Sequence, residues 1–202
     1  KKIKVILGIC ISVFLFLGGG LLAYIHKVDT DTLGRKITIY GLDVSGQNVE
    51  KAGQTIRKAF QDKKVVFRED GSQVYQTTVG ELGYSLDEGT LQSALTALKQ
   101  QRDQTRTFLA SWKNYKIEYQ VNKDETAEQA ALTEDHFGEK ERTEAQNAEI
   151  RYSKKNKKFV IVKQVAGTQI DEERLRNYVD KTLEAEFQDK LLTGEVKIDL
   201  NQ

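Results

Sequence analysis

The chain has 202 residues, of which 39% are apolar and 30% are charged, and its formal net charge is +1. This length suffices for one or two small domains with a buried core, and the near-neutral charge excludes a general attraction to nucleic acid or anionic lipid. The single cysteine, Cys10, excludes an internal disulfide and a paired-cysteine metal site. We therefore expect no cofactor and no metal.

Residues 3–25 read IKVILGICISVFLFLGGGLLAYI and carry one charge, on Lys4. Roughly 20 apolar residues at about 1.5 Å each span a hydrocarbon core of about 30 Å, so residues 1–25 are predicted to form a transmembrane anchor. A buried helix of a soluble protein and a cleaved signal peptide are the alternatives. The run is longer than the apolar core of about 7–15 residues in a signal peptide, and it ends without small residues for cleavage.

Charges around this segment predict its orientation. Three lysines, at positions 1, 2 and 4, precede the uninterrupted apolar run, whereas two acids follow it closely, at positions 29 and 31. The positive-inside rule then places the N-terminus in the cytoplasm and everything after His26 outside the cell membrane. Residues 26–34 are polar and without periodicity, which predicts a short linker.

The first predicted lobe covers residues 35–112. A strand over 36–40 leads into a turn, Asn48 is placed to cap a helix, and Asp70-Gly71 predicts a hairpin turn. Asp87 is placed to cap a second helix. The apolar faces of the two helices are Val49, Ala52, Ile56, Ala59 and Phe60 for the first, and Leu91, Ala94, Leu95 and Leu98 for the second.

The second predicted lobe covers residues 113–202. Strict alternation over 115–121 predicts one strand, and a short acidic helix over 127–132 follows. A hairpin crosses the sequence KKNKK, with Asn156 placed to take a left-handed conformation. A helix from Asp171 and a final strand complete the lobe. The helix has the apolar face Ile170, Leu175, Val179, Leu183 and Phe187.

One turn phrase occurs twice, each time between a strand and a helix. Its two copies are Val44, Ser45 and Gly46, and Val165, Ala166 and Gly167. Each glycine permits a positive φ or a close backbone approach. Chance and internal duplication both explain the recurrence. We expect structural turns within an α+β fold of two related lobes, in which helices pack on small antiparallel or mixed sheets.

The sequence offers no catalytic signature. Cys10 lies in the predicted span, and neither His26 nor His136 has a nucleophile nearby in sequence. There is no Gly-x-Ser-x-Gly elbow and no Walker loop. Paired carboxylates remain open, because 30 acids make coincidental pairs common. We expect that this chain is not itself an enzyme.

Two kinds of surface are candidate ligand-binding sites. The basic residues around SKKNKK are most simply explained as a solvated hairpin tip, and the functional alternative is attraction to an anionic wall polymer or to peptide carboxylates. Trp112 and Tyr84 are predicted stacking surfaces for sugars, whereas Tyr115 and Tyr119 are expected in the core. The basic candidates are Arg151, Lys154, Lys155, Lys157 and Lys158, with Lys163 nearby.

The apolar leader, LDVSGQNVEKA, LGYSLD and NAEIRYSKKNKKFVIVKQVAGTQID together resemble a wall-associated module of Gram-positive bacteria. This is the peptidoglycan-binding module that precedes the catalytic domain of L,D-transpeptidases and accompanies VanW-like proteins. The resemblance implies an extracellular, membrane-anchored protein whose partners are peptidoglycan and a fused or separate transpeptidase domain. The Ser-His-Gly-Cys motif of those enzymes is absent here, so catalysis would require residues beyond Gln202. The alternative is a protein-interaction scaffold or spacer at the cell envelope.

Overall fold

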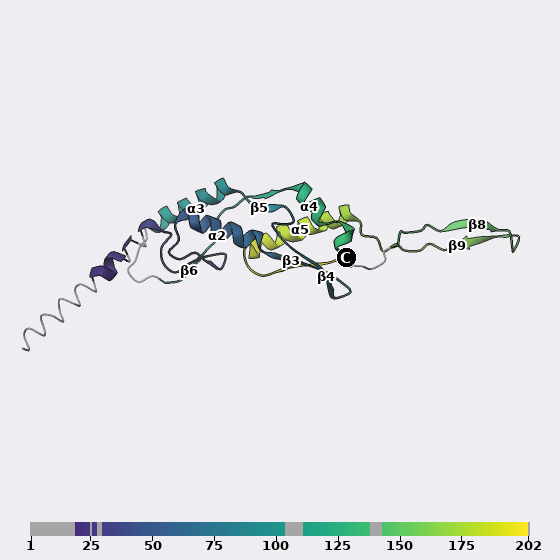
Figure 1. Cartoon of the computed structure of the whole chain (residues 1–202), viewed down its shortest axis with the longest axis horizontal. Helices are drawn as coiled ribbons and strands as arrows, with labels where there is room; N and C mark the ends of the chain where they lie inside the picture. Colours follow the sequence, from purple (N-terminus) through teal and green to yellow (C-terminus); the bar gives the residue numbers. More distant parts are fainter. Residues whose placement is uncertain (1–18, 25, 28–29, 104–110, 138–142, 202) are drawn as a thin grey trace, which may run out of the picture. The chain divides into compact units, whose positions relative to one another are not determined.

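The computed structural model describes residues 19–24, 26–27, 30–103, 111–137 and 143–201. It confirms a mixed α+β fold of helices and small antiparallel and mixed sheets (Figure 1). The predicted transmembrane segment lies mainly in residues 1–18 and at residue 25, outside the described residues. Among the residues described, no helix combines the length and the apolar character that crossing a membrane requires.

The described chain divides into two compact units, each assembled from three separate segments. Unit 1 takes residues up to 63, 84–123 and 190–194, and unit 2 takes 64–83, 124–189 and 195–202. This division differs from the single boundary expected between residues 112 and 113. The expected linker over residues 26–34 differs too, because residues 26–27 and 30–31 are helical and Leu33 is buried, with its N–H donating to the Gln47 carbonyl at 2.8 Å.

The described part of unit 1 includes two small sheets and two packed helices, and residues 19–24, 26–27 and 30–31 are also helical. In the first sheet, β1 (Ile37–Ile39) is antiparallel to β2 (Leu42–Asp43) and parallel to β6 (Lys113–Tyr115). In the second, β5 (Tyr84–Leu86) is antiparallel to β7 (Val121–Lys123). Helices α2 (Val49–Gln61) and α3 (Glu88–Asp103) contact each other. Their buried residues are Ala52, Gly53, Ile56 and Phe60, and Leu91, Leu95 and Leu98.

Both predicted helix caps in unit 1 are confirmed. The Asn48 side chain accepts a hydrogen bond from the Lys51 N–H at 2.8 Å. Asp87 Oδ1 accepts one from the Thr90 N–H, also at 2.8 Å. This backbone hydrogen bond is the main cause that lowers the pKa of Asp87 below its ordinary value. Side-chain oxygens thus satisfy amide groups that have no partner within the first helical turn.

The single strand predicted over residues 115–121 is wrong. The backbone pairs with β1 up to Tyr115 and with β5 from Val121, and it makes no ladder between them. Two long-range hydrogen bonds hold the intervening segment: Tyr40 Oη donates to the Ile117 carbonyl, and the Asp87 N–H donates to the Gln120 carbonyl, each at 2.8 Å. Alternation predicted an extended backbone correctly, but it carried no information about the change of partner.

Unit 2 is built around the sheet β10-β3-β4. Strand β3 (Lys64–Glu69) is antiparallel to β4 (Ser72–Thr78) and parallel to β10 (Val196–Asp199). Asp70 (φ 52°) and Gly71 (φ 78°) confirm the predicted turn between β3 and β4. Helix α4 (Glu125–Ala131) and the 3₁₀ turn η1 (Glu134–His136) follow. The long helix α5 (Glu172–Lys190) buries Leu175, Val179, Leu183 and Phe187 as predicted, whereas Ile170, also predicted on this face, precedes the helix and is half-buried.

The hairpin predicted across KKNKK is also confirmed. Strand β8 (Glu149–Ser153) is antiparallel to β9 (Lys158–Val162), and the two form a sheet of their own. The left-handed residue in the turn is Lys157, with φ of 50°, and not Asn156 as predicted. The Asn156 N–H instead donates to Ser153 Oγ at 3.3 Å. The turn therefore places its left-handed residue next to the returning strand.

The two copies of the repeated phrase use their glycines in different ways. Gly46 has a φ of +68° with open space around it, whereas a Cβ on Gly167 would lie 2.4 Å from the Ala145 amide nitrogen. Helix α2 begins three residues after Gly46, but α5 begins five residues after Gly167. The first phrase forms a turn at residues 45–46, as predicted, whereas the second is an extended segment in which Val165 bridges Gln146 and no turn is formed. Internal duplication remains a prediction.

Candidate functional site

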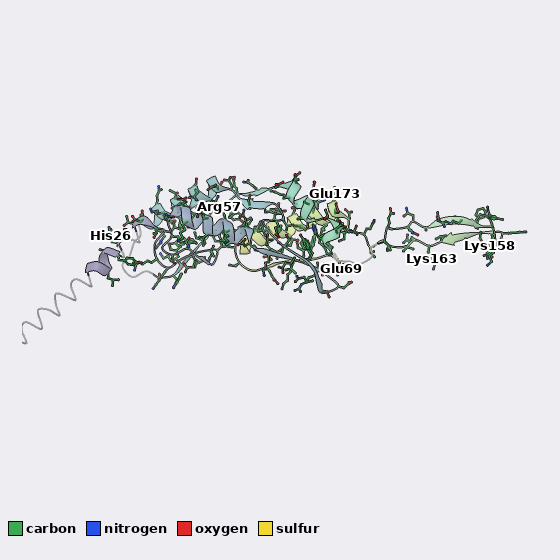
Figure 2. All side chains as sticks on the ribbon, viewed as in Figure 1. His26, Arg57, Glu69, Lys158, Lys163 and Glu173 are labelled. Atoms are coloured by element: carbon green, nitrogen blue, oxygen red, sulfur yellow. The ribbon has the colours of Figure 1, made fainter. Side chains whose placement is uncertain are left out.

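A cavity of about 610 Å³ opens in unit 2. Three parts of this unit line it: the β3–β4 turn, the segment leading into α5 with the first turns of that helix, and the end of β10. Figure 2 labels Glu69, which lies on the β3–β4 side of the cavity. The lining residues are Glu69, Asp70, Gly167, Thr168, Gln169, Ile170, Asp171, Arg174, Leu175, Tyr178, Asp199, Leu200 and Asn201.

The cavity lining carries both signs of charge. The lining residues include four acids and one arginine, Arg174, and Tyr178 adds a neutral polar residue. Leu175, which is buried, gives the lining an apolar part. A ligand with an amine, a carboxylate and small apolar groups would find a matching group for each.

Backbone hydrogen bonds orient two of the four carboxylates. Asp171 Oδ1 accepts from the Arg174 N–H at 3.0 Å and caps α5. Asp199 Oδ1 accepts from the Asn201 N–H, also at 3.0 Å, and the Leu200 N–H donates to the Arg68 carbonyl at 2.8 Å. These bonds fix the end of β10 and the start of α5, so two walls of the cavity have a defined geometry.

The second copy of the repeated phrase borders the cavity through Gly167. Gln146 and Val165 exchange two backbone hydrogen bonds of 2.9 Å, and the Thr168 N–H donates to the Thr143 carbonyl at 2.7 Å. Gly167 lies between these contacts, where no Cβ fits against Ala145. The sequence predicted a structural turn at this glycine, but it gave no indication that the residue borders a cavity.

A second distinctive surface lies on the β8–β9 hairpin. Four large apolar side chains lie in cross-strand pairs on one face, because Ile150 is paired with Ile161 and Tyr152 with Phe159. We call these four residues the apolar strip. They are between 53% and 75% exposed, and the Tyr152 and Phe159 rings meet edge to face with centroids 5.2 Å apart.

All five basic residues singled out in the sequence lie on this hairpin. Lys154, Lys155, Lys157 and Lys158 are at or beside the turn and are exposed, and we call them the basic tip. Arg151 lies on β8 and forms an ion pair with Glu149, which the sequence analysis did not anticipate. Figure 2 labels Lys158 and Lys163 on β9 and just after it.

The apolar strip itself was missed. The alternation of Ile150 with Tyr152, and of Phe159 with Ile161, was visible in the sequence. Such alternation normally predicts a face turned towards a core, and exposure cannot be read from it. Only the structure reveals that these side chains remain exposed.

The two aromatic candidates have opposite environments. Trp112 is 60% exposed, so it stays available as a stacking surface. Tyr84 is only 6% exposed, and Lys123 Nζ lies 5.6 Å from its ring centroid. This burial, caused by the pairing of β5 with β7, corrects the expectation of a stacking surface at Tyr84. Tyr115 and Tyr119 are half-buried.

The described residues contain no cluster of three or more His, Cys, Asp and Glu side chains able to hold a metal ion. His136 lies in the described part, where its ring stacks on Tyr75 with centroids 5.2 Å apart and an interplanar angle of 10°.

Comparison with known proteins gives no match: no family model, no curated protein and no solved structure matches this chain.

Proposed function

We propose that this chain is a membrane-anchored envelope module whose exported part binds peptidoglycan in the cavity of unit 2. The module is non-catalytic and belongs to the N-terminal part of an L,D-transpeptidase-like cell-wall protein. Residues 3–25 supply the anchor, with the N-terminus in the cytoplasm and the α+β units outside the membrane. The sequence resemblance and the apolar leader support this placement.

The observation that carries the proposal is the mixed charge of the cavity lining. Peptidoglycan stem peptides combine free carboxylates, an amine on a diamino acid and small apolar side chains. Arg174 supplies a donor for a carboxylate, and the four acids supply acceptors for an amine. Leu175 and its apolar neighbours suit alanine-sized side chains.

Retention on purified sacculi tests this proposal, with the full chain held in detergent micelles. Replacing Arg174 by Ala removes a charge-assisted hydrogen bond, and we expect retention to weaken about ten-fold or more. Arg176→Ala is the matched control, because Arg176 lies on the same helix, outside the cavity lining, and pairs with Glu172 at 3.8 Å. Equal retention of the two variants would exclude the cavity as the binding site.

Two further observations test the rest of the proposal. Protease added to intact cells should cleave the chain beyond His26 if the units lie outside the membrane. A downstream reading frame that encodes a His and a Ser-His-Gly-Cys motif would identify the catalytic part. If sacculi retain no protein above a charge-matched control, the module acts instead as an envelope spacer or protein-interaction scaffold.

A further inference from the structure

The β8–β9 hairpin combines an exposed apolar face with a local concentration of positive charge. It exposes the apolar strip, and between residues 149 and 163 it carries six basic residues against a single acid. The whole chain has a net charge of only +1, so this positive charge is local. A two-stranded hairpin is marginally stable in water without a surface to cover its apolar face. Among the described strands, none pairs with β8 or β9 from outside the hairpin.

We propose that the β8–β9 hairpin docks on an anionic lipid bilayer. The apolar strip faces the boundary between headgroups and acyl chains, and the basic tip contacts the anionic headgroups. Charge complementarity supports this occupant, because lysines close to an anionic bilayer surface strengthen binding one by one. The inference concerns a different surface from the cavity of the proposed function and does not depend on it.

A lipid surface suits the hairpin better than a glycan or a second copy of the chain. Ile150 and Ile161 have neither a flat ring nor a hydrogen-bonding group, and they are 70% and 75% exposed. A hydrated glycan would leave most of that aliphatic surface in water, whereas the acyl boundary removes it. A second copy would place another positively charged hairpin against this one, and like-charge repulsion opposes that contact.

The backbone limits how deeply the hairpin can enter the bilayer. The outer edges of β8 and β9 carry N–H and C=O groups without a described strand to pair with. Such groups must stay hydrated, since the hydrocarbon core offers them no partner. The hairpin therefore lies flat at the interface. Tyr152 is the strip residue of β8 nearest to the turn, and it has the amphipathic character of aromatic residues at membrane interfaces.

Quenching by brominated lipids tests the docking and its orientation in the full chain reconstituted into vesicles. Phe159→Trp, in a Trp112→Phe background, places the single probe on the apolar strip. Val160→Trp in the same background places it on the opposite face of the same strand. In vesicles containing phosphatidylglycerol, we expect stronger quenching at position 159 than at 160. Bromines near the carbonyl end of the acyl chains should quench more than bromines near the methyl end.

Charge is tested by replacing Lys154, Lys155, Lys157 and Lys158 together by Gln. Each lysine removed should weaken docking about five-fold, so quenching at 159 should fall to the level seen with phosphatidylcholine alone. Equal quenching at 159 and 160, quenching insensitive to lipid charge, or its absence would overturn the proposal. A different result would favour the wall: lipid does not quench the tryptophan at position 159 when the four lysines are kept, and replacing the four lysines by Gln abolishes retention on sacculi. The hairpin would then bind the wall and not the bilayer. A change at Arg174 alone tests the cavity and leaves lipid docking unaffected.

Discussion

Gly167 lies against Ala145 so closely that a Cβ on the glycine would come within 2.4 Å of the alanine amide nitrogen. Gly46 occupies the equivalent place in the first turn phrase, yet it has a positive φ of 68° and open space around it. Gly46 needs only a backbone that tolerates positive φ, whereas Gly167 needs the absence of a Cβ. Asparagine at each position tests the two needs separately, because asparagine tolerates the left-handed region but still carries a Cβ. We expect Gly46→Asn to be mild. Gly167→Asn should lower the free energy of unfolding by about 1–3 kcal/mol, because the two backbone segments must separate.

Urea denaturation of the two variants provides the measurement. The Gly167 variant should also weaken retention on sacculi, since residue 167 borders the cavity. Equal loss of stability in both variants would show that crowding against Ala145 is unimportant.

The cap of α2 gives a local prediction. Asn48 accepts a hydrogen bond from the Lys51 N–H at 2.8 Å. Its replacement by Ala leaves that amide without its acceptor, and we expect a loss of about 1 kcal/mol in the free energy of unfolding. Asn48→Asp keeps an acceptor at the same place and should retain most of the stability. A parental urea midpoint for the alanine variant would contradict this role of the cap.

An aromatic cluster stabilises the core of unit 2. The rings of Phe67 and Phe137 are both buried and meet edge to face, with centroids 5.2 Å apart, and Tyr75 contacts both rings. Phe137→Ala removes a large buried ring and leaves a cavity, so it should cost about 3–5 kcal/mol. Tyr75→Phe keeps the ring stack and should change stability by less than about 0.5 kcal/mol. Comparable thermal shifts in the two variants would show that the cluster is not tightly packed.

Glu81 gives the fold a dependence on pH. Thr77 Oγ1 donates to Glu81 Oε2 at 2.8 Å and the Thr78 N–H donates at 3.0 Å. Both bonds lower the pKa of Glu81 below its ordinary value of 4.5, and the bond from the Thr77 side chain has the larger effect. Because the folded-state pKa is the lower one, the stabilisation is fully present above the ordinary value. It is lost as the pH falls through the folded-state value.

Glu81→Gln should therefore lower the thermal midpoint near neutral pH, and its difference from the parent should shrink in acid. Glu173→Gln serves as the control, because Glu173 is exposed on α5 (Figure 2). A difference between Glu81→Gln and the parent that stays constant from neutral to acid pH would contradict this role.

Interactions between near neighbours in sequence were predictable. Asn48 and Asp87 cap the helices that follow them, and the Asp70-Gly71 turn has the positive φ values that its residues favour. Helix α5 buries the face that its 3.6-residue periodicity indicated. The caps and the turn depend on hydrogen bonds and backbone conformations within a few residues of the residues that predicted them.

Partner choice was not predictable in the same way. Residues 115–121 alternate as a strand does, yet the backbone pairs with β1 at one end and with β5 at the other. The exposure of the apolar strip and the burial of Tyr84 depend equally on which strands pair. Periodicity shows which side chains share a face, but it does not show what covers that face.

The sequence by itself determined the helices, their caps, the hairpin turns and the concentration of lysines between residues 154 and 158, because short-range hydrogen bonds and backbone sterics govern these features. Only the tertiary structure decided that β10 joins β3 and that residues near 69, 170 and 199 border one cavity. These groups are separated by up to about 130 positions in the chain. Their meeting depends on the burial of apolar surface across the whole of unit 2, which no local pattern encodes.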